Sequence, residues 1–279
     1  MVKYDPESAF ELALLGSRHK PILAIDLHAE RACQNRLYRR FSGKLEVIGE
    51  EKLRDPNLDL SRESRLIALI DMVDGTDLLK RGLSNWCSAL IFYRPKKKEI
   101  EAAFVGLPTE GIYYATKKSP ALFQPNGRKK PRRLKGPSSV SRWEDASVCF
   151  YGQKAKNFLS CAGNQKLIKD LKEIRKKEKE SGKETIFRIY NFGGNPMMVK
   201  LADGFVDAVF DFEGQAPHDV APGAYIAQKA GAIFRDLKGQ PISLPNVLLK
   251  PAADDSRLRY ILSSTTGLFR AFQKIIKQN

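Results

Sequence analysis

Two aspartates three residues apart, Asp71 and Asp74, follow an apolar segment and stand beside a Gly-Thr pair. A strand that ends in a turn here could direct both carboxylates, together with the carbonyl of Val73, at one spot. Hard cations such as Mg²⁺ prefer such oxygen ligands and often bind a substrate phosphate as well. A helix that begins at Gly75 and Thr76 would add backbone N–H groups for phosphate oxygens. The segment therefore predicts a metal and phosphate site, and it equally fits a plain Asp-Gly turn capped by threonine.

Further acidic positions could complete such a site. Gly49-Glu50-Glu51 follows another strand-like segment, so an adjacent strand end could face Asp71. Asp219 and Asp26 each stand where a helix is expected to begin. At those two positions an acid also has a structural interpretation, as a helix cap or a partner of the helix dipole. Whether these carboxylates serve chemistry depends on whether the fold brings them together.

Hydrophobic spacing predicts the elements that would position these residues. In the first part of the chain the pattern favours helices over 6–18 and 27–41 and strands over 44–48, 65–70, 86–93, 100–107 and 111–116. The segment 117–143, rich in proline and basic residues, is expected to be an exposed loop. After it, strands are expected over 146–151, 185–190, 205–210, 232–235 and 260–263, and helices over 165–180, 196–202, 220–230 and from about 266 onwards.

This order of elements predicts the α/β class and a single domain over residues 1–279. Its first half, residues 1 to about 140, is expected to be α+β with an antiparallel sheet, and its second half, from about 141, to be α/β. With 42% hydrophobic and 29% charged residues among 279, the composition excludes a disordered or low-complexity chain.

No apolar run approaches the roughly 18 residues that a spanning helix needs, and the first residues lack the features of a secretion signal. The four cysteines form no CxxC pair, so we expect reduced thiols, a cytoplasmic protein and no partnership with a membrane.

The net charge of +16 should attract phosphates or nucleic acids, and the run Arg128–Lys135 alone holds six basic residues. An alternative of another functional class is therefore a regulatory protein that binds nucleic acid through its basic surface. Phe123 and Trp143 flank the run without interleaved aromatic residues, which argues against base stacking. A solvated loop is the plainer interpretation.

The order and spacing of three motifs resemble the inositol monophosphatase family. The motifs are Asp71-Met72-Val73-Asp74-Gly75-Thr76, Gly49-Glu50-Glu51 and the stretch from Asp219 to Ala230-Gly231. The family belongs to a superfamily of lithium-sensitive, Mg²⁺-dependent phosphatases that also holds fructose-1,6-bisphosphatase and bisphosphate nucleotidase. The resemblance covers most of the chain from about Ile25, and it implies the layered αβαβα sandwich of the sugar-phosphatase fold.

The resemblance also implies roles for individual residues. The implied ligands of two or three Mg²⁺ ions are Glu51, Asp71, the Val73 carbonyl, Asp74 and Asp219. Thr76, paired with Asp26 or Glu51, is the implied group that orients and deprotonates the attacking water. The implied substrate contacts are Gly75, Thr76, Gly193, Gly194, Asp211 and Asp219, with Glu213 as an equal candidate to Asp211.

The resulting hypothesis is a Mg²⁺-dependent phosphomonoesterase that acts on a small polyol or sugar phosphate by direct attack of water. Fructose-1,6-bisphosphate and 3′-phosphoadenosine phosphates are alternative substrates on the same metal core, and a homodimer is the expected assembly. A haloacid-dehalogenase-type enzyme is excluded, because Met72 occupies the position of the nucleophilic aspartate. His218 and Met72 replace a tryptophan and a proline that are frequent in the family, and neither would be a metal ligand.

Overall fold

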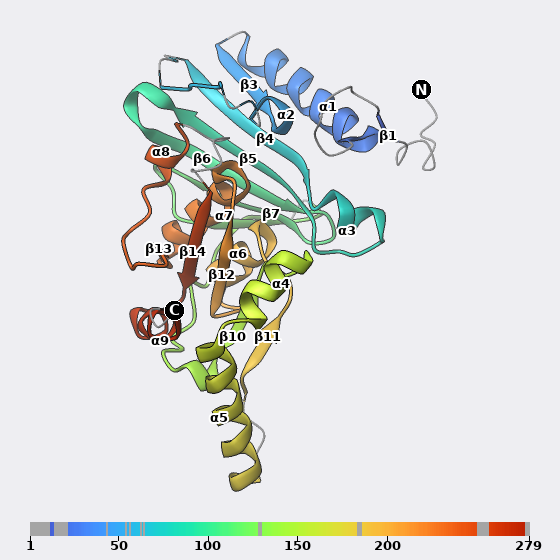
Figure 1. Ribbon diagram of the computed structural model, residues 1–279. Helices are drawn as coiled ribbons and strands as arrows, with labels where there is room; N and C mark the ends of the chain where they lie inside the picture. Colours follow the sequence, from blue (N-terminus) through green and yellow to red (C-terminus); the bar gives the residue numbers. More distant parts are fainter. Residues whose placement is uncertain are drawn as a thin grey trace.

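The computed structural model describes residues 12–13, 22–42, 44–53, 55, 57–61, 63, 65–127, 130–182, 186–249 and 257–276. Figure 1 shows two sheets with helices between and outside them. A two-stranded pair, β1 (Leu12–Ala13) and β2 (Ile22–Leu23), precedes the first helix.

The larger sheet has seven strands in the order β3-β4-β5-β6-β7-β8-β9. They are β3 (Leu45–Gly49), β4 (Leu66–Asp74), β5 (Cys87–Arg94), β6 (Glu99–Leu107), β7 (Gly111–Thr116), β8 (Leu122–Pro125) and β9 (Arg132–Arg133). The β3–β4 pair is parallel and every following pair is antiparallel. The parallel first pair matters for the site, because it places the C-terminal ends of β3 and β4 at one edge of the sheet.

The smaller sheet has five strands in the order β11-β10-β12-β14-β13. They are β10 (Ser147–Phe150), β11 (Arg188–Tyr190), β12 (Ala208–Gln215), β13 (Ile233–Asp236) and β14 (Leu258–Ser263). β10 runs parallel to β11 and β12, whereas β14 is antiparallel to β12 and β13.

The helices form one layer between the two sheets and one layer on the outer face of each sheet. They are α1 (Ala24–Phe41), α2 (Glu50–Leu53), α3 (Thr76–Lys80), α4 (Ala155–Ala162), α5 (Gln165–Ser181), α6 (Asn195–Ala202), α7 (Pro217–Ala230), α8 (Leu244–Val247) and α9 (Thr266–Ile276), with 3₁₀ turns at Pro95–Lys97 and Trp143–Asp145. α1 packs on β3 and β4, α6 and α7 contact both sheets, and α4 and α9 pack on the smaller sheet. The order is therefore α, β, α, β, α, and α5 projects away from the body (Figure 1).

The alternation along β4 decides which residues face the interior between the sheets. Ile67 and Leu69 belong to the main core, which also contains residues of α6 and α7. Ala68 and Ile70 belong to the separate core against which α1 packs. Because successive strand residues point to opposite faces, Asp71 continues the series of Ile67 and Leu69 toward α7.

The layered α/β fold that the sequence predicts is confirmed, and two local predictions are wrong. Leu12–Ala13 pairs as a strand with Ile22–Leu23, whereas a helix was predicted over 6–18, of which the remaining residues lie outside the described part. The segment 117–143 contains β8 and β9, which extend the larger sheet at its edge. These strands are too short to show alternation among so many basic residues and prolines.

Smaller differences concern element boundaries. The strand predicted over 205–210 begins at Ala208, and α7 begins at Pro217 instead of residue 220. α4 and α8 were not predicted, since each offers too few residues for a helical period. Among the described helices, none is long and apolar enough to cross a membrane.

Candidate active site

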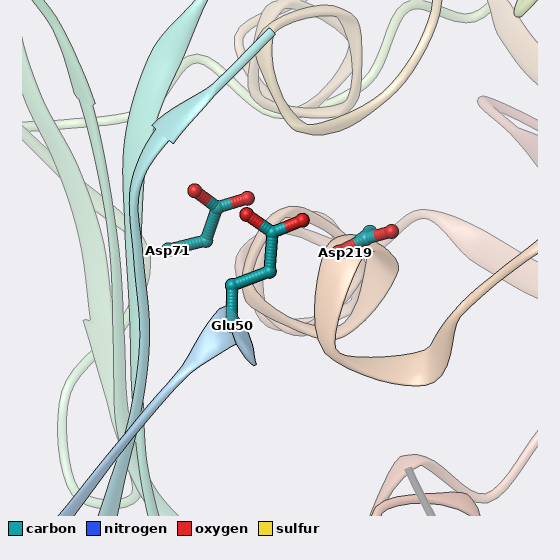
Figure 2. Close-up of side chains that lie close together, drawn as sticks. All are labelled: Glu50, Asp71 and Asp219. Carbon is teal, nitrogen blue, oxygen red and sulfur yellow. The ribbon is translucent and has the colours of Figure 1, made fainter. Parts of the chain in front are cut away.

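Three carboxylates from three separate elements meet at the edge of the larger sheet. Glu50 begins α2 directly after β3, Asp71 lies near the end of β4, and Asp219 lies in the first turn of α7. One carboxylate oxygen of each lies within 4.8 Å of those of the other two. In Figure 2, Glu50 and Asp71 turn their oxygens toward each other, with Asp219 beside them. The parallel pairing of β3 and β4 explains the first two, since it ends both strands together.

Asp74 joins this region through an irregularity in β4. Residues three apart on a regular strand point to opposite faces. Between Asp71, opposite Ala89, and Asp74, opposite Cys87, the register shifts by one residue. Such a bulge re-aims the side chains that follow it. Asp74 therefore also faces the interior, where its Oδ2 accepts hydrogen bonds from Asn195 Nδ2 at 2.9 Å and Cys87 Sγ at 3.5 Å.

The carboxylates lie close together, and burial with mutual repulsion raises the pKa values of Asp71 and Asp74. Burial, followed by the charges of Glu50, Asp74 and Asp219, raises the pKa of Asp71 well above its ordinary value. Burial and the charge of Asp219 raise the pKa of Asp74 to about 6, against the opposing hydrogen bond from Asn195. A divalent cation would remove this repulsion, and a set of carboxylate oxygens is the donor set that Mg²⁺ or Ca²⁺ prefers. The residues present thus fit a hard divalent cation.

Thr76 lies beside these carboxylates and contacts Asp26 across the chain. Its Oγ1 is 3.0 Å from Asp26 Oδ1, in the first turn of α1, and 2.9 Å from the carbonyl oxygen of Val73. A hydroxyl carries one hydrogen and can donate to only one of these acceptors at a time. Gly75 precedes it with φ 99°, a left-handed conformation that favours glycine and lets β4 turn directly into α3.

The residues that the resemblance implies for substrate binding lie on other elements. Asp211 is buried on β12, where Oδ1 accepts hydrogen bonds from the N–H groups of Glu213 and Gly214, at 2.8 and 2.7 Å. Its Oδ2 has no hydrogen-bond partner among the described residues. Burial raises the pKa of Asp211 to about 6. Gly193 packs against the backbone of Tyr151, and Gly194 directly precedes α6.

The resemblance implies Glu51 as a cation ligand, whereas the carboxylate that joins the cluster in the structure is that of Glu50. The side chain of Glu51 lies outside the described part of the structure. Both residues stood in the Gly-Glu-Glu motif, so only the change from strand to helix after Gly49 could have distinguished them. Asn195, which directly follows Gly193 and Gly194, is fully buried and bonded to Asp74. His218, which is not expected to be a metal ligand, is buried with Nε2 3.1 Å from Asp219 Oδ1.

Part of the basic segment has a structural role. Arg132 donates two hydrogen bonds to Asp203, whose side chain is fully buried, and the N–H of Lys135 donates a third. Arg128 and Lys129 lie outside the described residues. The nucleic-acid alternative stays a prediction.

Comparisons with known proteins agree with the fold. The sequence profile described as the inositol monophosphatase family matches residues 10–270. No curated protein matches the chain.

Among solved structures, an IMPase from Thermotoga maritima is 19% identical with a TM-score of 0.65, over 96% of this chain and 87% of that one. A Ca-bound IMPase family protein from Staphylococcus aureus is 17% identical with a TM-score of 0.67, over 98% and 89%. An IMPase/NADP phosphatase complexed with Mg²⁺ and phosphate is 18% identical with a TM-score of 0.67, over 98% and 89%.

At these identities the solved structures establish the shared fold, and the profile match covers nearly the whole sequence. The chain therefore belongs to the inositol monophosphatase family and is a phosphatase of that type.

Proposed function

We propose that this chain is a Mg²⁺-dependent phosphomonoesterase that hydrolyses a small polyol or sugar phosphate by direct attack of water. The observation that carries the proposal is the convergence of Glu50, Asp71 and Asp219 from three elements. Carboxylates that raise one another's pKa cost folding stability, and a cation that they bind offsets this cost. Of the similar solved structures, one is complexed with Mg²⁺ and phosphate and another is bound to Ca²⁺, which supports a divalent cation here as well.

The proposed cation ligands are the oxygens that lie at this edge of the sheet. They are Glu50 with Glu51 as the alternative, Asp71, the Val73 carbonyl, Asp74 and Asp219. Bound as two or three Mg²⁺ ions, the metal would supply Lewis-acid stabilisation of the phosphate and leaving-group oxygens and a lowered pKa for the attacking water.

Thr76 and Asp26 would manage the proton of that water. When Thr76 Oγ1 donates its hydrogen to Asp26 Oδ1, its lone pairs are free to accept a hydrogen bond from the water. Asp26 can then receive a proton through the threonine hydroxyl. The alternative acceptor, the Val73 carbonyl, holds the hydroxyl in place while Asp26 is protonated. The pair thus acts as an orienting group and base, a role that typically contributes about 10²- to 10⁴-fold.

The proposed substrate contacts come from both halves of the chain. The backbone N–H groups of Gly75 and Thr76, at the start of α3, are proposed to hold phosphate oxygens. Asp211 Oδ2 offers an acceptor for a substrate hydroxyl. Gly193 and Gly194 complete the proposed contacts, together with Asp219. A polyol or sugar leaving group carries hydroxyls that can donate a hydrogen bond to the buried carboxylate of Asp211, so this contact favours such a substrate.

A phosphate-release assay over a panel of compounds tests the proposal. Inositol phosphate, fructose-1,6-bisphosphate, histidinol phosphate and 3′-phosphoadenosine phosphate are each incubated with the protein, with Mg²⁺ and with a chelator. We expect Mg²⁺-dependent release from at least one of them, and its loss in Asp219→Asn. Release that persists in chelator, or turnover in Asp219→Asn equal to that of the wild type, would contradict the proposal.

A further inference from the structure

Asn195 joins the two halves of the candidate site through a single side chain. It is the first residue of α6 and is fully buried. Its amide makes three hydrogen bonds: Nδ2 donates to Asp74 Oδ2 at 2.9 Å and to the carbonyl oxygen of Asp219 at 2.7 Å, and Oδ1 accepts from the N–H of Gly223 at 2.7 Å. Both amide hydrogens and the amide oxygen therefore have partners in the interior.

Two of these bonds involve a pair of backbone groups that face each other in a helix. In an α-helix the N–H of residue i bonds to the carbonyl of residue i−4, so Gly223 and Asp219 are natural partners in α7. The amide of Asn195 bonds to both members of this pair. Pro222, one residue earlier, has no N–H, so this turn already lacks one internal hydrogen bond. The buried amide thus ties the turn of α7 that carries Asp219 to the start of α6.

The sequence leaves room for this contact at Gly223. A Cβ atom there would lie 2.8 Å from Asn195 Oδ1 and 2.9 Å from Met198 Cβ, closer than ordinary contacts allow. Any larger residue would push α7 away from α6. The small residue is therefore needed for the approach of the two helices, and the approach lets the short asparagine side chain reach both α7 and β4.

The third bond extends the link to the larger sheet. Asp74 lies at the end of β4, whereas Asp219 lies on α7, and the two come from sequence positions 145 residues apart. With Oδ2 of Asp74 occupied by the amide, the rotation of this carboxylate is fixed and Oδ1 remains for a cation. An aspartate in place of Asn195 would lack both donors, and an alanine or serine would be too short to join all three partners.

We propose that Asn195 is a positioning residue that sets the placement of Asp74 relative to Asp219 and so determines the affinity of the site for its cation. The inference rests on the proposed function, since it concerns the same site. It assigns Asn195 to the cation side of the site, away from the substrate contacts that its loop was expected to make. Partners that orient metal ligands typically change metal affinity by about 10- to 100-fold when they are removed.

The test measures cation binding in the absence of substrate. Wild type, Asn195→Ala and Asn195→Ser are titrated with Mg²⁺ by calorimetry at low temperature, with circular dichroism to establish that each is folded. The matched control is Asn164→Ala, which removes another buried asparagine whose side chain accepts a hydrogen bond from the N–H of Leu167 at 2.9 Å and caps α5. Phosphate release against Mg²⁺ concentration provides the second readout.

We expect both Asn195 variants to need about 10- to 100-fold more Mg²⁺ for half-saturation, and to recover turnover as Mg²⁺ is raised. Asn164→Ala should lower the melting temperature while keeping the wild-type Mg²⁺ midpoint. Folded Asn195 variants with an unchanged midpoint would overturn the inference and leave the proposed function standing. Absence of Mg²⁺ binding by the wild-type protein would overturn the proposed function, and the inference with it.

Discussion

Replacing Asp74 by asparagine should separate the stability of this chain from its activity. Asp74 is crowded by Asp219 in a buried setting, so its ionised form is unfavourable without a cation. Asparagine has nearly the same shape and keeps an oxygen that can accept the hydrogen bond from Asn195. We therefore expect Asp74→Asn to stabilise the cation-free protein and to abolish Mg²⁺-dependent phosphate release.

The size of the stabilisation follows from the pKa of Asp74. Burial raises it from 3.8 to about 6, so the folded chain binds more protons than the unfolded chain between these values. The free energy of unfolding of the wild type therefore falls as pH rises through this window. A shift of about 2 units corresponds to about 3 kcal/mol at neutral pH, an upper bound for the gain in Asp74→Asn. For a chain of this size that is a rise in melting temperature of about 5 °C.

The loss of activity should be large. A metal ion typically supplies several kcal/mol of transition-state stabilisation, and about 4 kcal/mol corresponds to roughly a thousandfold in kcat/KM.

The assay compares thermal melts in chelator at pH 4.5 and 7 with phosphate release in Mg²⁺. The stability difference between wild type and Asp74→Asn should shrink from about 3 kcal/mol at pH 7 to about 1 kcal/mol at pH 4.5, because the folded carboxyl is then protonated while the unfolded one is still partly ionised. Asp77→Asn is the matched control, since Asp77 is exposed three residues further along, on α3. Turnover in Asp74→Asn within about tenfold of wild type, or a lower melting temperature than wild type in chelator at pH 7, would refute the reasoning.

Three further predictions concern other residues. Thr76→Val and Asp26→Asn should each lower kcat by about 10²- to 10⁴-fold at an unchanged Mg²⁺ midpoint, and the double variant should lose no more; additive losses would contradict a joint role. Arg132→Ala should lower the free energy of unfolding, measured in urea, by about 2–3 kcal/mol and leave kcat unchanged. The loss is smaller than the roughly 3–5 kcal/mol typical of breaking a fully buried ion pair, because the Arg132 side chain is 41% exposed. Burial gives Asp211 a folded pKa of about 6, so in chelator the free energy of unfolding of the wild type should fall as pH rises from about 4. Asp211→Asn should remove up to about 3 kcal/mol of this fall, and an equal pH dependence of the two proteins in urea titrations would contradict the prediction.

The local part of the candidate site could be predicted from the sequence, because it depends on residues close in the chain. Asp71, Val73, Asp74, Gly75 and Thr76 span the end of one strand and the turn that follows it. An apolar run that ends in two acids and a Gly-Thr pair already indicates this geometry. The structure adds the register shift between Asp71 and Asp74, which alternation alone does not reveal.

The choice between Glu50 and Glu51 depends on an event that composition does not indicate. A strand that continued past Gly49 would place these two side chains on opposite faces. The chain instead begins α2 at Glu50, and the carboxylate of Glu50 joins Asp71 and Asp219. Element boundaries are the least determined feature of a hydrophobic pattern, and a boundary shift of one residue exchanges the two glutamates.

Asn195 shows why long-range partners of the site were missed. Nothing within its own loop distinguishes it from a residue that contacts substrate, since Gly193 and Gly194 precede it and Pro196 follows. Its role arises only when α6 packs on α7 and the missing Cβ of Gly223 lets the amide approach the helix. The sequence feature that indicates this contact is therefore a pair of residues, an asparagine at the start of one helix and a glycine in the first turns of another. Each member of the pair has its meaning only in the presence of the other, so single motifs indicate the candidate ligands Asp74 and Asp219 but do not indicate the side chain that joins them.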